Sequence, residues 1–326
     1  MVSRWMESIF LLIALAILIV TPSTSNAQTD PFAQNSSEFA FCLSVTGYGN
    51  DSFFTEPLSL ALDEHASLIY VADSKAGVVD AFSFQGVAKQ QYGEKQGLKS
   101  PFGLAVSKNG DLYVSEDEAG PIKIINAKGE VTKLDIPKAD GEETPKPGKM
   151  SFDDDDNLYV VDRANDKICV FGGDRKLKSK IGGRGDKRGL FKTLQDMAVD
   201  RSGRVYALDA DSVPVQVFDK KGSFIYRFGF HGDDGQDILS PAAIFIDHND
   251  QIWIVDKAQH SLKVFDRSGT YLRTFGSYGQ AENSFFYPCD AKIDSLGRVY
   301  TVESGAKRLQ VFSVIKPFER FAPQGL

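Results

Sequence analysis

The chain is poor in cysteine. It has three cysteines in 326 residues, Cys42, Cys169 and Cys289. An odd number cannot pair completely within one chain, and the wide spacing places the three in different copies of the repeat described below. The sequence therefore argues against a disulfide framework. It predicts small buried thiols and a stability that comes from apolar burial.

The chain also lacks net positive charge. It carries 37 Lys and Arg against 44 Asp and Glu, which gives a formal net charge of −7. Proteins that bind nucleic acid need a basic surface to neutralise phosphates. The charge balance therefore argues against a nucleic-acid partner.

Long apolar runs are missing except near the N-terminus. The run at 9–20 is shorter than the ~20 residues that a membrane-spanning helix needs. Arg4 precedes this run, and the small residues at 25–27 follow it. That order is typical of an export signal that is removed from the mature protein.

We therefore predict a signal peptide at 1–27, cleaved after Ala27, and an N-terminal linker at 28–38. The mature chain then has no transmembrane span and works in the periplasm or outside the cell. Glu7 weakens the positive charge of the signal, so a segment that is kept as an anchor remains an alternative.

What the sequence has in abundance is one repeated motif. An apolar residue is followed by an aromatic residue, two small or apolar residues and an acid, and the copies start roughly 45 residues apart. The six copies end on Asp73, Glu116, Asp162, Asp209, Asp256 and Glu303. A repeat of this length, made of short β-runs, predicts the blades of a six-bladed β-propeller of the all-β class.

The fifth copy shows the repeat unit most clearly. Runs at 243–247, 252–256, 261–265 and 270–275 alternate apolar and polar residues, and clusters of Gly, Asp, Asn and Ser separate them. This pattern predicts four strands joined by tight turns. A glycine-rich connector then leads to the next copy.

The two ends of the chain predict how the ring closes. The last copy, at 290–312, has only three strands, whereas 41–45 resembles a fourth strand with no blade before it. The N-terminal strand should therefore complete the last blade and remove an open sheet edge. The propeller is predicted at 39–312, with a C-terminal tail at 313–326.

These motifs together resemble the NHL-repeat family of six-bladed propellers. A proline, an inner strand, a Gly-centred turn and two further strands follow one another at 241–265, 101–125 and 288–312, and the resemblance covers 41–312. The second copy departs from it at its exit, where 135–148 replaces the usual connector. The third copy is expected to lack the proline. The resemblance implies the fold and a habit of binding partners, but no single chemistry.

The six acids that end the repeated motif form one candidate site. A ring of carboxylates could hold a cation. A short acid at the end of a strand, however, also accepts hydrogen bonds from the backbone of the following loop. Because every copy needs that turn, we expect caps rather than a metal site.

Positions where the repeats disagree form a second candidate site. At two aligned places of the inner strands half or more of the copies have small residues, but Lys149, Asp196, Asp290 and Lys292 break this pattern. They are expected at the mouth of the central channel, near the loop residues Lys75, Arg163 and Lys257. Such charges could orient a polar ligand or dock a side chain of a partner, or they could simply form ion pairs with one another.

The positions of the four histidines bear on whether the chain has a zinc-dependent active site. Some secreted NHL-type propellers are zinc-dependent lyases with histidines that meet at the channel. Here His65 and His248 fall in turns on the opposite face, and neither His231 nor His260 lies on an inner strand. Three converging histidine ligands are therefore not available, and we expect no catalytic residue, metal or cofactor.

A basic stretch in the third copy forms a third candidate site. Its cations are Arg175, Lys176, Lys178, Lys180, Arg184, Lys187 and Arg188. Lysines on an outer strand commonly block edge pairing. Alternatively, the stretch forms a patch for an anionic glycan, a lipid headgroup or an acidic protein.

From the sequence we therefore predict an exported propeller that acts as a non-enzymatic binding or assembly module for protein partners. The alternative is a metal-dependent hydrolase or lyase whose metal is held by carboxylates at the channel mouth. A weaker alternative is binding of an anionic glycan by the basic stretch.

Overall fold

The computed structural model describes residues 39–49, 52–232 and 234–314. The chain divides into a unit at 1–33 and a unit at 34–326, and only the second contains described residues. The predicted signal peptide and linker, and the tail from 315 onward, lie outside the described residues.

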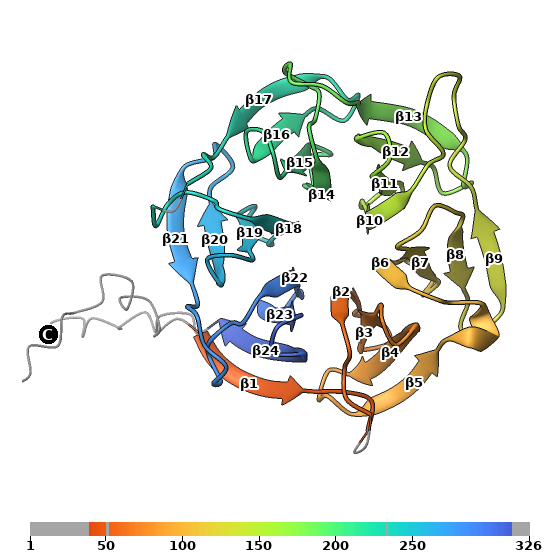
Figure 1. Cartoon of the computed structure of the whole chain (residues 1–326), viewed down its shortest axis with the longest axis vertical. Coiled ribbons are helices and arrows are strands. Elements are labelled where there is room, and N and C mark those ends of the chain that lie inside the picture. Colours follow the sequence, from red (N-terminus) through yellow and green to blue (C-terminus); the bar gives the residue numbers. More distant parts are fainter. Residues whose placement is uncertain (1–38, 50–51, 233, 315–326) are drawn as a thin grey trace, which may run out of the picture. The chain divides into compact units, whose positions relative to one another are not determined.

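Six four-stranded antiparallel sheets form the described part of the chain (Figure 1). Blade 1 consists of β2 (Pro57–Asp63), β3 (Leu68–Asp73), β4 (Val78–Ser83) and β5 (Ala88–Tyr92). Blade 2 consists of β6 (Pro101–Val106), β7 (Leu112–Glu116), β8 (Ile122–Ile125) and β9 (Val131–Leu134). Blade 3 consists of β10 (Pro147–Phe152), β11 (Leu158–Asp162), β12 (Lys167–Phe171) and β13 (Leu177–Gly182).

The other half of the ring repeats this plan. Blade 4 consists of β14 (Leu194–Val199), β15 (Val205–Asp209), β16 (Val215–Phe218) and β17 (Phe224–Phe228). Blade 5 consists of β18 (Pro241–Ile246), β19 (Ile252–Asp256), β20 (Ser261–Phe265) and β21 (Tyr271–Phe275). Blade 6 consists of β22 (Pro288–Ile293), β23 (Arg298–Glu303), β24 (Arg308–Val314) and β1 (Phe39–Val45).

The predicted ring closure is confirmed. β1 pairs with β24 in an antiparallel register that sets Phe41 opposite Phe312, so the first strand of the chain is the outer strand of the last blade. β24 continues to Val314, slightly beyond the predicted boundary at 312, because its last residues pair with the start of β1. The six-bladed propeller fold is therefore as predicted.

The prediction about the missing proline is wrong. β10 of blade 3 begins at Pro147, and the copy without the proline is the fourth, where β14 begins at Leu194. The loop at 135–146 obscured the alignment, because it lacks the glycine-rich composition of the connectors that precede the other inner strands.

Apolar side chains pack the blades against one another. Trp253 of blade 5 stacks between Phe245 and Phe275, with ring centroids 5.5 and 5.2 Å away, in a cluster that also contains Phe285 and Phe312 on the side of blade 6. Each large apolar side chain that is fully buried in this way stabilises the fold by roughly 2–3 kcal/mol. Cys169 and Cys289 are buried free thiols as expected, whereas Cys42 is exposed on the outer strand β1.

The acids that end the second strands act as caps, and they do more than predicted. Asp73 accepts hydrogen bonds from the backbone N–H groups of Thr55 and Glu56, at 2.6 and 2.8 Å. Asp256 does the same for Leu239 and Ser240, at 2.7 and 3.1 Å. Each acid therefore ties the connector that enters a blade to the end of its second strand.

The antiparallel order defines two faces of the propeller. We call the face that carries the connectors and the loops between second and third strands the entry face, because every inner strand begins there. The opposite face carries the turns between first and second strands. Within the described residues, no helix is long and apolar enough to cross a membrane.

Candidate active site

Four charged residues of the inner strands meet in the channel. Lys149 comes from β10 in blade 3, Asp196 from β14 in blade 4, and Asp290 and Lys292 from β22 in blade 6. We call these four residues the channel cluster. The inner strands that carry them surround the centre of the ring (Figure 1).

Lys149 joins the cluster together across the channel. Its Nζ lies 3.2 Å from Oδ1 of Asp290 and 3.6 Å from Oδ2 of Asp196, and it donates hydrogen bonds to the carbonyl oxygens of Ala242 and Cys289, both at 3.1 Å. A single lysine from blade 3 therefore links blades 4, 5 and 6.

The backbone fixes both carboxylates. Asp290 accepts from Ser59 Oγ at 2.8 Å and from the N–H groups of Leu60 and Ala291 at 3.0 and 2.9 Å. Asp196 accepts from the N–H groups of Met197 and Ile244, at 2.8 and 3.0 Å. Each carboxylate thus bonds its own blade and the next one, which holds its orientation independently of Lys149.

The environments of the two carboxylates differ. Burial raises the pKa of Asp196, and the nearby Lys149 and Lys292 oppose this only in part. Burial also acts on Asp290, but Lys149, Lys292 and the Leu60 and Ser59 donors outweigh it, so the pKa of Asp290 is lowered. Of the two carboxylates, Asp196 is therefore the one that takes up a proton more readily.

Lys149 remains charged in this setting. Burial by itself lowers the pKa of Lys149, but the carboxylates of Asp290 and Asp196 outweigh burial and raise the pKa above its ordinary value. Asp196 and Asp290 are each 1% exposed and Lys149 is 7% exposed, so solvent does not screen these charges.

Lys292 is the accessible member of the cluster. Its side chain is 26% exposed, and its Nζ lies 3.6 Å from Oδ1 of Asp290. The aligned positions of the other inner strands hold mostly small side chains, namely Ala61, Ala105, Ser151 and Ala198. The large aromatic Phe245 stands at the sixth. A small molecule in the channel would therefore meet Lys292 before the buried carboxylates.

The loop cations predicted beside these residues do not join them. Arg163 lies over the ring of Phe102, with its guanidinium carbon 3.8 Å from the ring centroid, and it pairs with Asp117 at 3.0 Å. Lys75 is exposed and Lys257 is partly buried, and neither contributes to the contacts of the channel cluster.

A metal does not fit this donor set. The part of the chain that the structure describes contains no group of three or more His, Cys, Asp or Glu side chains placed to hold a metal ion. At the channel cluster, the ammonium group of Lys149 lies between the two carboxylates, in the place that a shared cation would need.

A second group of residues on the entry face was missed by the sequence analysis. His260 is surrounded by the rings of Tyr278, Phe286 and Tyr287, at centroid distances of 5.0, 5.9 and 4.7 Å. We call these four residues the aromatic cluster. The side chains of Tyr278 and Tyr287 are 67% and 42% exposed, and Tyr287 stands only three residues before Asp290 of the channel cluster.

Backbone strain marks the aromatic cluster. Tyr287 adopts a φ angle of 53°, a left-handed conformation that costs bulky residues roughly 1–3 kcal/mol. His260 has a φ of 52°, but this belongs to a turn shared with other blades, where Gly77, Asp166 and Lys307 are also left-handed. The N–H of Tyr287 donates to Nδ1 of His260 at 3.0 Å, and burial lowers the pKa of His260, so the neutral ring carries its proton on Nε2. The sequence analysis missed this site because it looked for three converging histidines. The sequence did contain one indication of it, since Tyr287 is the only aromatic residue that directly precedes one of the six inner strands.

The basic stretch is largely neutralised within the molecule. Lys180 pairs with Glu142 at 3.1 Å, and Arg184 pairs with Asp166 and Glu143 at 2.8 and 3.2 Å. Arg175 pairs with Asp111, Lys176 pairs with Asp174, and Lys178 donates to Asn157. Only the neighbouring Lys187 and Arg188 are left exposed without such contacts among the described residues.

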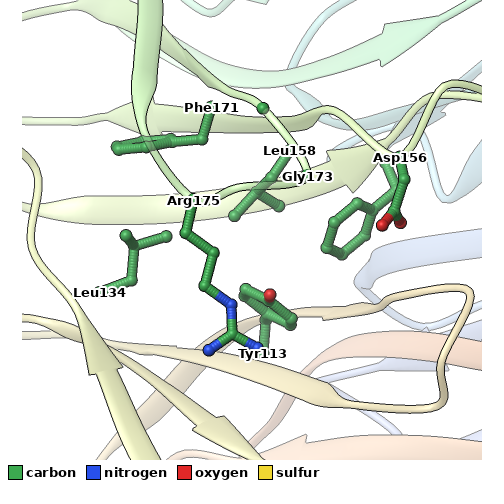
Figure 2. Close-up of a pocket in the computed structure, with 9 residues that line it drawn as sticks. Tyr113, Leu134, Asp156, Leu158, Phe171, Gly173 and Arg175 are labelled. Atoms are coloured by element: carbon green, nitrogen blue, oxygen red, sulfur yellow. The ribbon is translucent and has the colours of Figure 1, made fainter.

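A small cleft lies between blades 2 and 3 on the opposite face. Its empty space, which includes the open mouth, is ≈ 230 Å³. Arg175 extends over this cleft toward the ring of Tyr113, while Leu134, Leu158 and Phe171 form apolar walls (Figure 2). The guanidinium of Arg175 is held by Asp111 at 3.3 Å, so the charge at this cleft is also paired.

Comparison with known proteins identifies similar folds. No protein-family model matches the chain, and no curated protein sequence matches it. A virginiamycin B lyase from Staphylococcus aureus is similar in structure, with a TM-score of 0.62, 13% identity and coverage of 85% of this chain and 100% of the lyase. A streptogramin B lyase covers 85% of this chain and 98% of its own, with a TM-score of 0.58 and 13% identity.

A gluconolactonase from Xanthomonas campestris is also similar, with a TM-score of 0.62, 15% identity and coverage of 80% of this chain and 86% of the other. At these identities the likeness shows the fold alone, a six-bladed propeller. The expectation of a non-enzymatic binding module is nevertheless contradicted, because these similar propellers are enzymes, and the enzyme alternative agrees better with them. The repeat motif misled the prediction, because it encodes the scaffold that enzymes and binding proteins share.

Proposed function

We propose that this chain is a propeller enzyme, a hydrolase or lyase whose active site is the channel cluster. One observation carries the proposal: two buried carboxyl groups face the same lysine, but their pKa values are displaced in opposite directions. Two titratable groups whose environments separate their pKa values are the usual arrangement of an acid and its ionised partner in catalysis.

The residues would divide the chemistry as follows. Asp196, which takes up a proton more readily than Asp290, would protonate the leaving oxygen when water from the channel attacks the carbonyl carbon and the ester or lactone bond breaks. The attacking water would then return a proton to Asp196, so that the site ends the reaction as it began. Asp290 would stay ionised and hold the two lysines in place. Lys292, the accessible cation, would stabilise the negative charge that develops on the carbonyl oxygen. The similarity to propellers named as lyases and as a gluconolactonase supports this class of reaction.

The aromatic cluster would form one wall of the substrate site. It lies on the entry face, next along the chain to the strand that carries Asp290 and Lys292. Tyr287 has a left-handed backbone that the residues before the other inner strands do not share. Such strain persists only where the surroundings enforce it, and it is concentrated at functional sites.

The test is an activity screen with the purified mature chain. Acid release from a panel of esters and lactones would be followed in a pH-stat, with Asp196→Asn, Lys292→Met and the control Lys257→Met. Asp196→Asn should lower kcat by about 100-fold or more, in the range of a lost general acid. Lys292→Met should lower kcat/KM, and Lys257→Met should change neither. Circular dichroism melting would establish that the variants are folded.

Two results would reject the proposal. One is that the folded chain releases acid from none of these substrates. The other is that Asp196→Asn and Lys292→Met keep the full activity.

We also propose that the chain is an exported NHL-type propeller. Support comes from the proline-led inner strands, the glycine-rich connectors and the apolar run before Ala27. N-terminal sequencing of the protein recovered from its native cells should begin at Gln28. A sequence that begins at Met1 would show that the segment is retained.

A further inference from the structure

The ammonium group of Lys149 has the surroundings of a bound cation. Four oxygen atoms lie within 3.6 Å of its Nζ, two from the carboxylates of Asp196 and Asp290 and two from the backbone carbonyls of Ala242 and Cys289. Carboxylate and carbonyl oxygens are the ligands that hard divalent cations such as Ca²⁺ take in proteins.

These oxygen atoms come from parts of the fold that do not depend on Lys149. The two carbonyls belong to the second residues of β18 and β22, and the carboxylates are held by the N–H groups of Met197, Ile244, Leu60 and Ala291. The oxygen-lined site is therefore built by blades 4, 5 and 6 and by blade 1. The lysine reaches it from blade 3.

The charges require a cation in this place. Without Lys149, two carboxylates that are each 1% exposed would face only Lys292. A buried charge that loses its partner is strongly destabilising, so either a proton or another cation has to take over.

The size of the site selects the cation. The distances of 3.1 to 3.6 Å around Nζ exceed the ~2.3–2.6 Å of Ca²⁺–oxygen bonds and exceed still further the ~2.0–2.1 Å of Mg²⁺–oxygen bonds. Calcium tolerates irregular coordination and additional waters, whereas magnesium demands a compact octahedron. The emptied site should therefore favour Ca²⁺ over Mg²⁺.

We propose that Lys149 takes the place of a bound metal ion in the channel, so that this propeller carries its own covalently attached cation and works without added metal. The part about activity rests on the proposed function above. The part about cation binding stands without it, because it concerns only the oxygen atoms and the lysine.

The experiment compares two substitutions at one position. Lys149→Ala removes the ammonium and leaves space, whereas Lys149→Met removes the charge but fills the space with a side chain of similar length. Binding of CaCl₂ and MgCl₂ would be measured by isothermal titration calorimetry after EDTA treatment, and melting would be followed with and without each salt.

The intact chain should melt at the same temperature with Ca²⁺ and with EDTA. Lys149→Ala should melt lower, bind one Ca²⁺ with a Kd of roughly 10⁻⁴–10⁻³ M and recover part of the lost stability in Ca²⁺. Lys149→Met should bind none, and addition of Asp290→Asn to Lys149→Ala should abolish binding. If Lys149→Ala folds poorly, the yield of refolded protein is measured with and without Ca²⁺ instead. Ca²⁺ should raise that yield.

The proposal is overturned if folded Lys149→Ala binds no Ca²⁺, or if Ca²⁺ does not improve its refolding. It is also overturned if the intact chain binds Ca²⁺ and loses stability or activity in EDTA. Because the titration needs no substrate, a chain that proves inactive on esters and lactones leaves this result unaffected.

Discussion

At the scale of single residues, Asp80 shows how a departure from the repeat buries a carboxyl group and shifts its pKa. The aligned third-strand residues in blades 2, 4, 5 and 6 are Lys123, Gln216, Lys263 and Gln310. These are hydrogen-bond donors, whereas blade 1 has a carboxyl group that is 3% exposed. Burial raises the pKa of Asp80 to about 6, although Gln91 donates a hydrogen bond to it at 2.8 Å.

The raised pKa predicts a pH dependence. The unfolded chain releases this proton near pH 4, whereas the folded chain keeps it to about pH 6. Stability is therefore lost as the pH rises through that interval, because the folded state binds more protons than the unfolded state. Asp80→Asn removes this loss and should raise the free energy of unfolding by roughly 1–3 kcal/mol at pH 8 and little at pH 4.

Urea denaturation at pH 4 and pH 8 would measure the effect. Asp140→Asn, at an exposed loop position, serves as the matched control and should change stability at neither pH. If the free energy of unfolding changes by the same amount between pH 4 and pH 8 in Asp80→Asn and in the intact chain, the environment assigned to Asp80 is incorrect.

At the scale of structural elements, the third strands hold the connectors in place. Gln216 donates to the carbonyl of Leu190 at 2.7 Å, Lys263 to that of Gly235 at 2.8 Å and Gln310 to that of Ser284 at 3.0 Å. Each donor lies on the third strand of the blade that its connector enters. The connectors of the entry face are therefore fixed by polar side chains, and the aromatic cluster rests on one of them.

Blade 3 uses a different device for the same task. The connector that enters it, the loop at 135–146 that we call the acidic loop, contains Glu142, which pairs with Lys167 and Lys180. The contact with Lys167, the N–H of Ala139 and Lys180 lower the pKa of Glu142 to about 2. The acidic loop and the basic stretch of blade 3 are therefore partners of one another.

At the scale of the whole molecule, the ring depends on one non-local strand pairing. β1 and β24 lie at opposite ends of the described chain, and their contact turns a row of blades into a closed ring. Phe41 packs edge-to-face on Phe312, and the side chains of Leu43 and Val45 reach the turn at Gly86 in blade 1. β1 thus covers the junction between the last blade and the first.

Removal of β1 should therefore destabilise the entire propeller. A mature chain that starts at Ser52 loses this strand and exposes the edge of β24, and its melting temperature should fall by about 10 °C or more. A chain that starts at Phe39 keeps β1 and should melt like the mature protein. Differential scanning calorimetry of the two truncations would measure this, and equal melting temperatures would contradict the role of β1.

Local sequence patterns determine much of the fold of this protein. The repeated motif, the turn residues and the short last copy determined the six blades and the ring closure, because strand and turn preferences act over a few residues and recur in every copy. Comparison of the copies also pointed to Lys149, Asp196, Asp290 and Lys292, since residues that break a repeat are not needed by its scaffold.

Only the tertiary structure decided how these residues interact. Whether Lys149 points into solvent or spans the channel depends on the closure of the ring, which brings blades 3, 4 and 6 together across its centre. The opposite displacements of the Asp196 and Asp290 pKa values, the pairing of the basic stretch with the acidic loop and the packing around His260 all arise from such distant contacts. They depend on burial and on distances between blades, which no local sequence pattern contains.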